Sequence, residues 1–132
     1  MITAYIDTGP LYEFVAAEKK DFHQKAKELL LSQNYQWFSS TYIFDELMTL
    51  FLGRISKKKI ISVGENLKNS SIINWVHPDP DDDEACWDIF KKYSDKLWSY
   101  TDCMSLHLIQ KNKIKKVFSF DHHFEQMGLD LL

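Results

Sequence analysis

Two hydrophobic patterns alternate along this chain: short apolar runs, and longer stretches in which apolar residues recur every three or four positions. The short runs are typical of buried strands and the longer stretches of amphipathic helices. Strands are predicted at Ile2–Ile6, Gln36–Ser39 and Ile72–Val76, from Lys116 through the apolar run Val117–Phe120, and at Leu129–Leu132. Placing helices between them gives the order β-α-α-β-α-α-β-α-α-β-α-β. This order predicts a three-layer α/β/α fold with a mostly parallel central sheet.

Capping residues and turn formers mark most of the helix boundaries. Pro10 is tolerated in the first turn of the helix that follows Asp7. Later helices are predicted from Asp21, from Ser40 and Thr41 through Arg54, from Ser56 to about Lys68, and from Thr101 as N-cap to Asn112. No internal repeat and no linker rich in proline, glycine or serine divides the chain. We therefore expect one domain over residues 1–132.

The acidic run from His77 to Glu84 is the most conspicuous charge feature. It lacks the Asp-x-Asp-x-Asp-Gly spacing of a calcium loop. Acidic side chains at a helix N-terminus are stabilised by the helix dipole, and Ala85, Trp87 and Ile89 continue the run at helical spacing. We interpret the run as the start of a helix and not as a metal site.

Composition narrows the class of protein. A chain of 132 residues, 45% of them hydrophobic, can bury a core without disulfides. Its net charge of −3 does not favour a protein that binds nucleic-acid duplexes without sequence preference. The lysines of 57–59 and 111–116 could guide a phosphate backbone, or they could be solvated residues at helix ends. Cys86 and Cys103 form no C-x-x-C motif, and no segment approaches the roughly 18 apolar residues of a membrane span. We expect a reduced, cytoplasmic protein without a membrane segment.

Four acidic residues occupy positions where parallel sheets carry their functional groups. Asp7 follows the first strand and Asp121 the fourth, Asp102 opens a helix, and Glu46 lies early in the helix after Ser40. If the first and fourth strands flank the point where the strand order reverses, their carboxyl ends meet in a crevice where these acids converge. Taken singly, Asp7 also fits an ordinary helix cap, and Glu46 the exposed margin of an apolar stripe.

Four converging carboxylates repel one another, so such a cluster needs a divalent cation or raised pKa values. Oxygen ligands without a required histidine or cysteine favour a hard cation, Mg²⁺ or Mn²⁺ rather than Zn²⁺. A metal-bound water in an acidic pocket is a nucleophile for phosphodiester hydrolysis, and the metal shields the phosphate from the carboxylates. The pattern therefore leads to a nuclease hypothesis.

Four segments of the chain resemble the PIN domain family, and within it the VapC-type toxin ribonucleases. The segment Tyr5–Gly9 is similar to the family's apolar strand that ends in Asp followed by Thr or Ser. The segment Asp45–Leu47 matches its middle acidic motif, and Ser99–Cys103 and Ser119–Phe124 resemble its two C-terminal motifs. The two C-terminal segments are fairly specific together, and the order of all four covers essentially the whole chain.

The resemblance implies a site and an activity. Asp7, Glu46, Asp102 and Asp121 would form a Mg²⁺ site, in which Mn²⁺ can substitute, that activates water to cleave single-stranded RNA. It also implies a cognate antitoxin encoded nearby, which would cover the active site with an arginine competing for the acids, and a homodimer. The sequence itself adds only a surplus of aromatic residues for such interfaces, namely Tyr12, Phe14, Trp37, Phe38 and Phe51.

Some neighbours of the acids also receive an interpretation. Thr8 is a candidate for orienting Asp7. Ser105, one helical turn after Asp102, is a candidate for placing a phosphate or simply a small polar helix residue. His122 and His123 are interpreted as strand-end and cap residues, either of which could contact phosphate; position 123 is acidic in some relatives. Asp45 is a weaker candidate, because on a helix it points about 100° away from Glu46.

Three other functional classes compete with the nuclease. A PIN-like module that binds RNA or protein without cutting is disfavoured by the presence of all four acids. A receiver-type phosphoacceptor needs a paired acid near the N-terminus and a lysine after the last strand, and the chain has neither. A phosphatase with an aspartate nucleophile needs Asp-x-Asp, where this chain has Asp7-Thr8-Gly9.

Overall fold

The computed structural model describes all 132 residues and contains one parallel sheet. Its strands lie in the order β3-β2-β1-β4-β5, and every neighbouring pair is parallel. The strands are β1 (Ile2–Ile6), β2 (Tyr35–Ser40), β3 (Ile73–Val76), β4 (Lys116–Phe118) and β5 (Asp130–Leu131). The predicted order of strands and helices is confirmed. So is the predicted reversal of strand order, which lies between β1 and β4.

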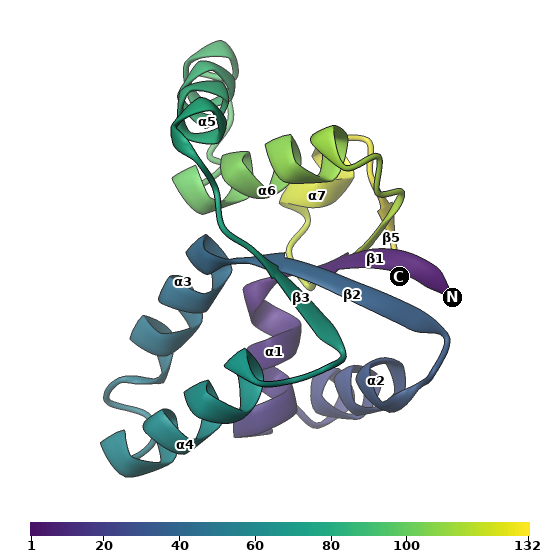
Figure 1. Cartoon of the computed structure of the whole chain (residues 1–132), viewed down its shortest axis with the longest axis vertical. Coiled ribbons are helices and arrows are strands. Elements are labelled where there is room, and N and C mark those ends of the chain that lie inside the picture. The colour runs from purple at the N-terminus through teal and green to yellow at the C-terminus, as the bar shows by residue number, and fades with distance from the viewer.

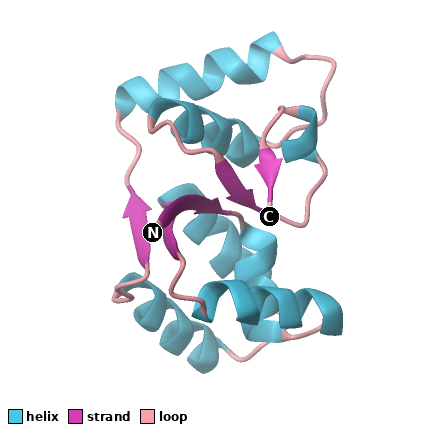
Figure 2. Ribbon diagram, turned by 90° about the vertical axis from the view of Figure 1, so that its right-hand side faces the viewer, coloured by secondary structure: helices cyan, strands magenta, loops and turns pink.

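Helices cover both faces of the sheet and complete the predicted three layers. Helices α5, α6 and α7 lie on one side, and α1, α2 and α4 lie on the other (Figure 1). Figure 2 shows the strands between these layers, in the view turned by 90°. The helices are α1 (Thr8–Ala16), α2 (Lys20–Leu31), α3 (Thr41–Phe51), α4 (Lys57–Lys68), α5 (Pro80–Lys92), α6 (Tyr100–Lys111) and α7 (His123–Gln126).

Three predicted boundaries were wrong. Helix α3 stops at Phe51 and excludes Arg54, because the C-cap Leu52 is extended and the chain then turns through Gly53 at a φ of 80°. The N-cap of α6 is Ser99 and not Thr101. The Ser99 hydroxyl accepts a hydrogen bond from the Asp102 N–H, and the Asp102 carboxylate accepts one from the Ser99 N–H. Strand β4 ends at Phe118, so Asp121 lies on the loop beyond it.

Large side chains fill the space on both faces of the sheet. Trp37, Tyr5, Phe118 and Phe124 are among the largest fully buried residues. The aromatic surplus expected at interfaces was placed on the wrong residues, since Tyr12, Trp37 and Phe51 are buried and Phe14 and Phe38 half-buried. The aromatic residues that do reach the surface are Phe22, Trp87, Phe90 and Tyr100. None of the helices has both the length and the apolar character needed to cross a membrane.

The acidic run opens α5, as predicted from its position. Asp79 caps the helix and forms a reciprocal capping box with Asp82. Asp82 is buried and also contacts His107 (2.7 Å) and Lys111 (2.9 Å) of α6. Backbone and side-chain donors hold the pKa of Asp82 well below its usual range. This carboxylate ties α5 to α6 and so fixes the helix that carries Asp102.

Candidate active site

The four predicted acids line a single pocket at the carboxyl ends of β1 and β4. Asp7 directly follows β1, Asp121 lies just beyond β4, Glu46 lies on α3 and Asp102 in the first turn of α6. Helix α3 contacts both α1 and α6, which brings Glu46 to the same edge of the sheet. The pocket has a volume of about 520 Å³. Its lining is completed by Thr8, Gly9, Leu50, Ser99, Phe120, His122 and His123.

Asp7 is the most deeply enclosed of the four acids, with 6% of its surface exposed. Its carboxylate accepts a hydrogen bond of 2.7 Å from the Ser119 hydroxyl and another from the Thr8 N–H. Burial raises its pKa to about 7, with a further contribution from the charges of Asp102 and Glu46, while the two hydrogen bonds lower it. An ionised Asp7 is therefore costly unless a cation compensates it.

Glu46 is half-buried and held inward. The Thr8 hydroxyl donates a hydrogen bond of 2.5 Å to it. The interpretation of Glu46 as an exposed helix margin is therefore wrong, because a neighbouring donor fixes the carboxylate in the pocket. Thr8 was expected to orient Asp7, but its hydroxyl donates to Glu46 instead. Only the backbone N–H of Thr8 donates to Asp7.

Asp102 and Asp121 face each other across the ring of His123. The His123 Nδ1 atom lies 2.9 Å from one Asp102 oxygen and 3.4 Å from an Asp121 oxygen. One atom from each of these three residues lies within 4.8 Å of the others, a spacing that fits ligands of one metal ion. The interpretation of His123 as a mere cap residue missed this contact. Its neighbour His122 is exposed and reaches only Glu125, at 3.4 Å.

Ser119 links two of the acids and was not predicted. Its hydroxyl donates to Asp7 and accepts a hydrogen bond of 2.9 Å from the Asp121 N–H. The Asp121 carboxylate in turn accepts a 3.0 Å bond from the His123 N–H, which closes the turn after β4. The only signal in the sequence was a hydroxyl residue two positions before an acid, a pattern typical of a local side-chain turn.

Two further predictions can be judged from the geometry. Ser105 does not reach the pocket: it is completely buried, and its hydroxyl lies 2.9 Å from the Tyr5 hydroxyl beneath α6. Its candidacy for placing a phosphate is wrong, because this face of α6 packs on the sheet. Asp45 is exposed and does not line the pocket, in agreement with its rating as a weaker candidate.

The donors in the pocket fit a hard divalent cation. Four carboxylates offer oxygen ligands, one histidine stands beside two of them, and neither lysine nor arginine lines the pocket. The buried Asp7 therefore faces other acids with neither lysine nor arginine among the lining residues to neutralise it. Oxygen-rich sites of this kind suit Mg²⁺ or Mn²⁺ better than Zn²⁺.

Comparison with known proteins agrees with the fold. The profile of the PIN domain family matches residues 4–129. The 23S rRNA-specific endonuclease VapC20 of Mycobacterium tuberculosis is 23% identical over 106 residues, which cover 80% of each chain. The crystal structure of M. tuberculosis VapC20, described as a toxin that cleaves the sarcin-ricin loop, has a TM-score of 0.86 at 21% identity and covers 96% of this chain and 95% of its own.

Complexes of related proteins share the fold as well. VapBC2 of Rickettsia felis, bound to a DNA fragment from its promoter, has a TM-score of 0.73 at 10% identity, covering 99% of this chain and 98% of that one. VapBC-1 of nontypeable Haemophilus influenzae has a TM-score of 0.67 at 14% identity, covering 99% and 97%. The protein belongs to the PIN domain family. Of the three structures, VapC20 of M. tuberculosis has the highest TM-score.

The raised pKa of Asp7 predicts how the metal-free protein responds to pH. An acid whose pKa is higher in the folded than in the unfolded state contributes stability at low pH and loses it as the pH rises through the folded value. In EDTA, the native protein should therefore lose up to about 4 kcal/mol between pH 4 and pH 8 through Asp7. Asp7→Asn should escape this loss and gain in relative stability as the pH rises.

Denaturant unfolding of both proteins at several pH values measures the effect, with Asp45→Asn as the control because Asp45 is exposed. A constant difference between native protein and Asp7→Asn from pH 4 to pH 8 would contradict the assigned environment of Asp7.

Proposed function

We propose that the protein is a divalent-cation-dependent endoribonuclease that hydrolyses phosphodiester bonds of single-stranded RNA, and that it is the toxin of a toxin–antitoxin pair in the cytoplasm. The observation that carries the proposal is the single pocket lined by Asp7, Glu46, Asp102 and Asp121. Membership of the PIN domain family and the likeness to an rRNA-specific endonuclease support RNA as the substrate.

In this proposal the four carboxylates hold Mg²⁺, with Mn²⁺ as a substitute. The bound cation would supply an activated water and shield the scissile phosphate from the acids. The same cation would favour the ionised state of the four carboxylates. It would thereby offset the free-energy cost of burying a charged Asp7.

The remaining polar residues of the pocket have positioning roles. Ser119 holds Asp7 and the Asp121 backbone, and Thr8 holds Glu46. His123 contacts both Asp102 and Asp121 and so limits their separation. Asp121 keeps 44% of its side-chain surface exposed, so the pocket opens to a large substrate on this side. The chain thus orients its ligands through short hydrogen bonds and leaves the reaction side accessible.

Removal of one carboxylate at a time tests the assignment. Asp7→Asn, Glu46→Gln, Asp102→Asn and Asp121→Asn should each reduce cleavage more than about 100-fold, because each removes an anionic ligand while keeping its volume. The fold should survive, since Asn at position 102 keeps an oxygen for the Ser99 N–H. Cleavage of a mixed pool of single-stranded RNA is measured with Mg²⁺, with Mn²⁺ and with EDTA.

The matched control is Asp45→Asn, which removes an exposed acid next to Glu46 and should cut at the native rate. A variant of the four that keeps the native rate would show that its carboxylate is not a ligand. Equal cleavage in EDTA and in Mg²⁺ would refute the metal-dependent mechanism as a whole.

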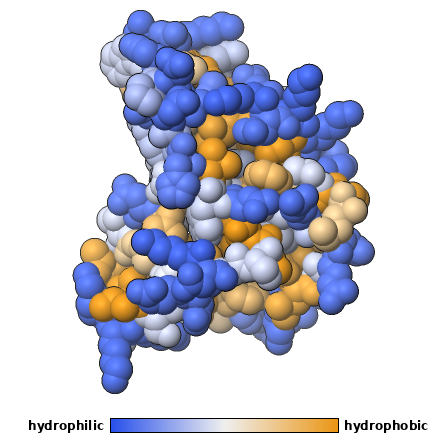
Figure 3. All heavy atoms as spheres, viewed as in Figure 1, coloured by the Kyte–Doolittle hydropathy of each residue, from blue (hydrophilic) through white to orange (hydrophobic).

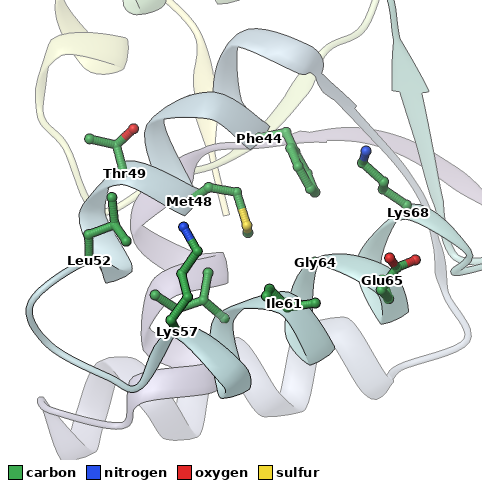
Figure 4. Close-up of a pocket in the computed structure, with 10 residues that line it drawn as sticks. Phe44, Met48, Thr49, Leu52, Lys57, Ile61, Gly64, Glu65 and Lys68 are labelled. Carbon is green, nitrogen blue, oxygen red and sulfur yellow. The ribbon is translucent and has the colours of Figure 1, made fainter.

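An apolar groove between α3 and α4 supports an antitoxin as partner. Phe44, Met48 and Leu52 from the α3 side face Ile61 and Gly64 of α4 across a hollow of about 290 Å³ (Figure 4). Leu52 and Ile61 are each more than half exposed, and apolar surface is visible over this part of the molecule in Figure 3. Lys57 stands at one end of the groove, and Lys68 stands with Glu65 at the other (Figure 4). An apolar helix with an acidic residue near Lys57 would complement the groove, and the antitoxin would continue from there to cover the acids.

Ile61→Asp should weaken the complex with the cognate antitoxin at least about tenfold, because it places a charge in an apolar contact. RNA cleavage by the free protein should not change. Leu31→Asp, at an exposed apolar position on α2 outside the groove, is the control and should bind as the native protein does. The complexes are compared by titration calorimetry, and equal affinity of the two variants would remove the groove from the interface.

A homodimer is the second proposed assembly. Trp87 and Phe90 of α5 stack at 5.9 Å, and Phe90 packs edge-on against Tyr100, which approaches Tyr42 of α3. Trp87, Phe90 and Tyr100 are all exposed and form one aromatic surface. Aromatic residues concentrated in this way are typical of protein interfaces, so this surface is where the two copies would meet.

A further inference from the structure

A second hollow lies against the acid pocket and shares part of its wall. We call it the side pocket; its volume is about 480 Å³. The residues common to both hollows are Phe120, Asp121 and His122. The side pocket is completed by Phe22, Lys25, Ser119, Glu125, Leu131 and Leu132. A group bound here would therefore lie next to whatever is bound at the acids.

The wall of the side pocket is a pair of stacked aromatic rings. Phe22 of α2 lies parallel to Phe120, with ring centroids 4.0 Å apart and an interplanar angle of 9°. Phe120 is itself held edge-on by the buried Phe118, at 5.4 Å and 83°. Phe22 keeps 36% of its surface exposed, so much of this ring is not used by the core. The stack is thus held on its inner side by Phe118, while Phe22 stays partly exposed on its outer side, where the Lys19 ammonium approaches the ring.

Two lysines stand beside this aromatic wall, whereas neither lysine nor arginine lines the acid pocket. The Lys19 ammonium lies 5.3 Å from the centroid of Phe22, and Lys25 lines the hollow with its ammonium 2.8 Å from the Leu132 carbonyl. Flat aromatic surface with adjacent cations is the combination that binds single-stranded nucleic acids, through base stacking and phosphate neutralisation. Glu125 adds an exposed carboxylate, which accepts hydrogen bonds from the amino groups of bases.

We propose that the side pocket binds an unpaired nucleobase of the RNA, stacked on Phe22, beside the phosphodiester that is cut. This inference rests on the proposed nuclease function and adds to it a device that selects the cleavage position. Phe22 contacts the substrate and determines specificity, while Phe120 positions Phe22 and separates the base from the acids. The stack requires a base that has left its helix, which agrees with single-stranded RNA as substrate.

Base stacking can be measured without cleavage. The variant Asp102→Asn is mixed, in the presence of Mg²⁺, with short single-stranded RNA oligonucleotides. Each oligonucleotide carries the fluorescent base 2-aminopurine at a different position. Stacking should quench the fluorescence at one position, and Phe22→Ala in the same background should abolish that quenching. Phe22→Trp should retain it, because the larger ring also stacks. No quenching at any position, or quenching that survives Phe22→Ala, would overturn the proposal.

Kinetics give the second test, on proteins that keep all four acids. Phe22→Ala should raise KM about 5- to 100-fold, the factor that corresponds to one lost base–aromatic stack, and should broaden the choice of cleavage position. Phe22→Trp should restore both properties. Replacing the stacked base by an abasic nucleotide should raise KM of the native protein by a similar factor. The same replacement should leave KM of Phe22→Ala almost unchanged. Full additivity of the two losses would contradict direct contact.

Phe44→Ala is the matched aromatic control, because Phe44 lines the groove between α3 and α4 and not the side pocket. Thermal unfolding verifies that each variant is folded. If the native protein cuts RNA and Phe22→Ala has no effect, base binding in the side pocket is refuted and the nuclease function stands. Quenching at Phe22 without any cleavage by the native protein would refute the nuclease and leave base binding intact. An effect of Phe22→Ala on antitoxin affinity alone would also refute the base subsite.

Discussion

The burial of one carboxylate, Asp7, beside other acids at the ends of β1 and β4 is the constraint on which the rest of the site depends. Asp7 is buried beside other acids: burial is the main reason that its pKa rises to about 7, and the charges of Asp102 and Glu46 add to the rise. Hydrogen-bond partners hold the carboxylates in place: the hydroxyls of Thr8 and Ser119 donate to Glu46 and Asp7, and the ring of His123 contacts Asp102. Neither lysine nor arginine lines the pocket. The arrangement therefore holds its acids in place without neutralising them, which is what a site for an exchangeable divalent cation requires.

The fold supplies this arrangement through its topology. The strand order reverses between β1 and β4, so two strand ends and the start of α6 meet at one edge of the sheet. Asp82 ties α5 to α6 and steadies the helix that presents Asp102, while the turn after β4 is closed by Ser119 and His123. The same turn carries Phe120, which forms the boundary between the acids and the side pocket. The boundary between the two pockets is thus formed by the same loop that carries Asp121.

The sequence was sufficient to predict the element order and the convergence of the four acids, because both follow from periodicity and from the edge at which parallel strands end. It was insufficient for contacts that depend on turn geometry. The contacts of His123 with Asp102 and Asp121, and of Ser119 with Asp7, join residues that only the folded loop brings together. Ser105 failed for a related reason: helical spacing placed it near Asp102, but the packing of α6 turned it toward Tyr5. Aromatic residues were abundant in the sequence, yet only burial separates core members such as Trp37 from exposed ones such as Phe22.

The central claim is that the carboxylates bind a divalent cation in exchange for protons. Titration calorimetry with Mn²⁺ at pH 7 and pH 9, each in two buffers of different ionisation enthalpy, tests it most directly. Because the pKa of Asp7 is about 7, binding at pH 7 should release part of a proton, and binding at pH 9 should release almost none. Absence of Mn²⁺ binding, or binding with the same proton release at both pH values, would contradict the account of the site.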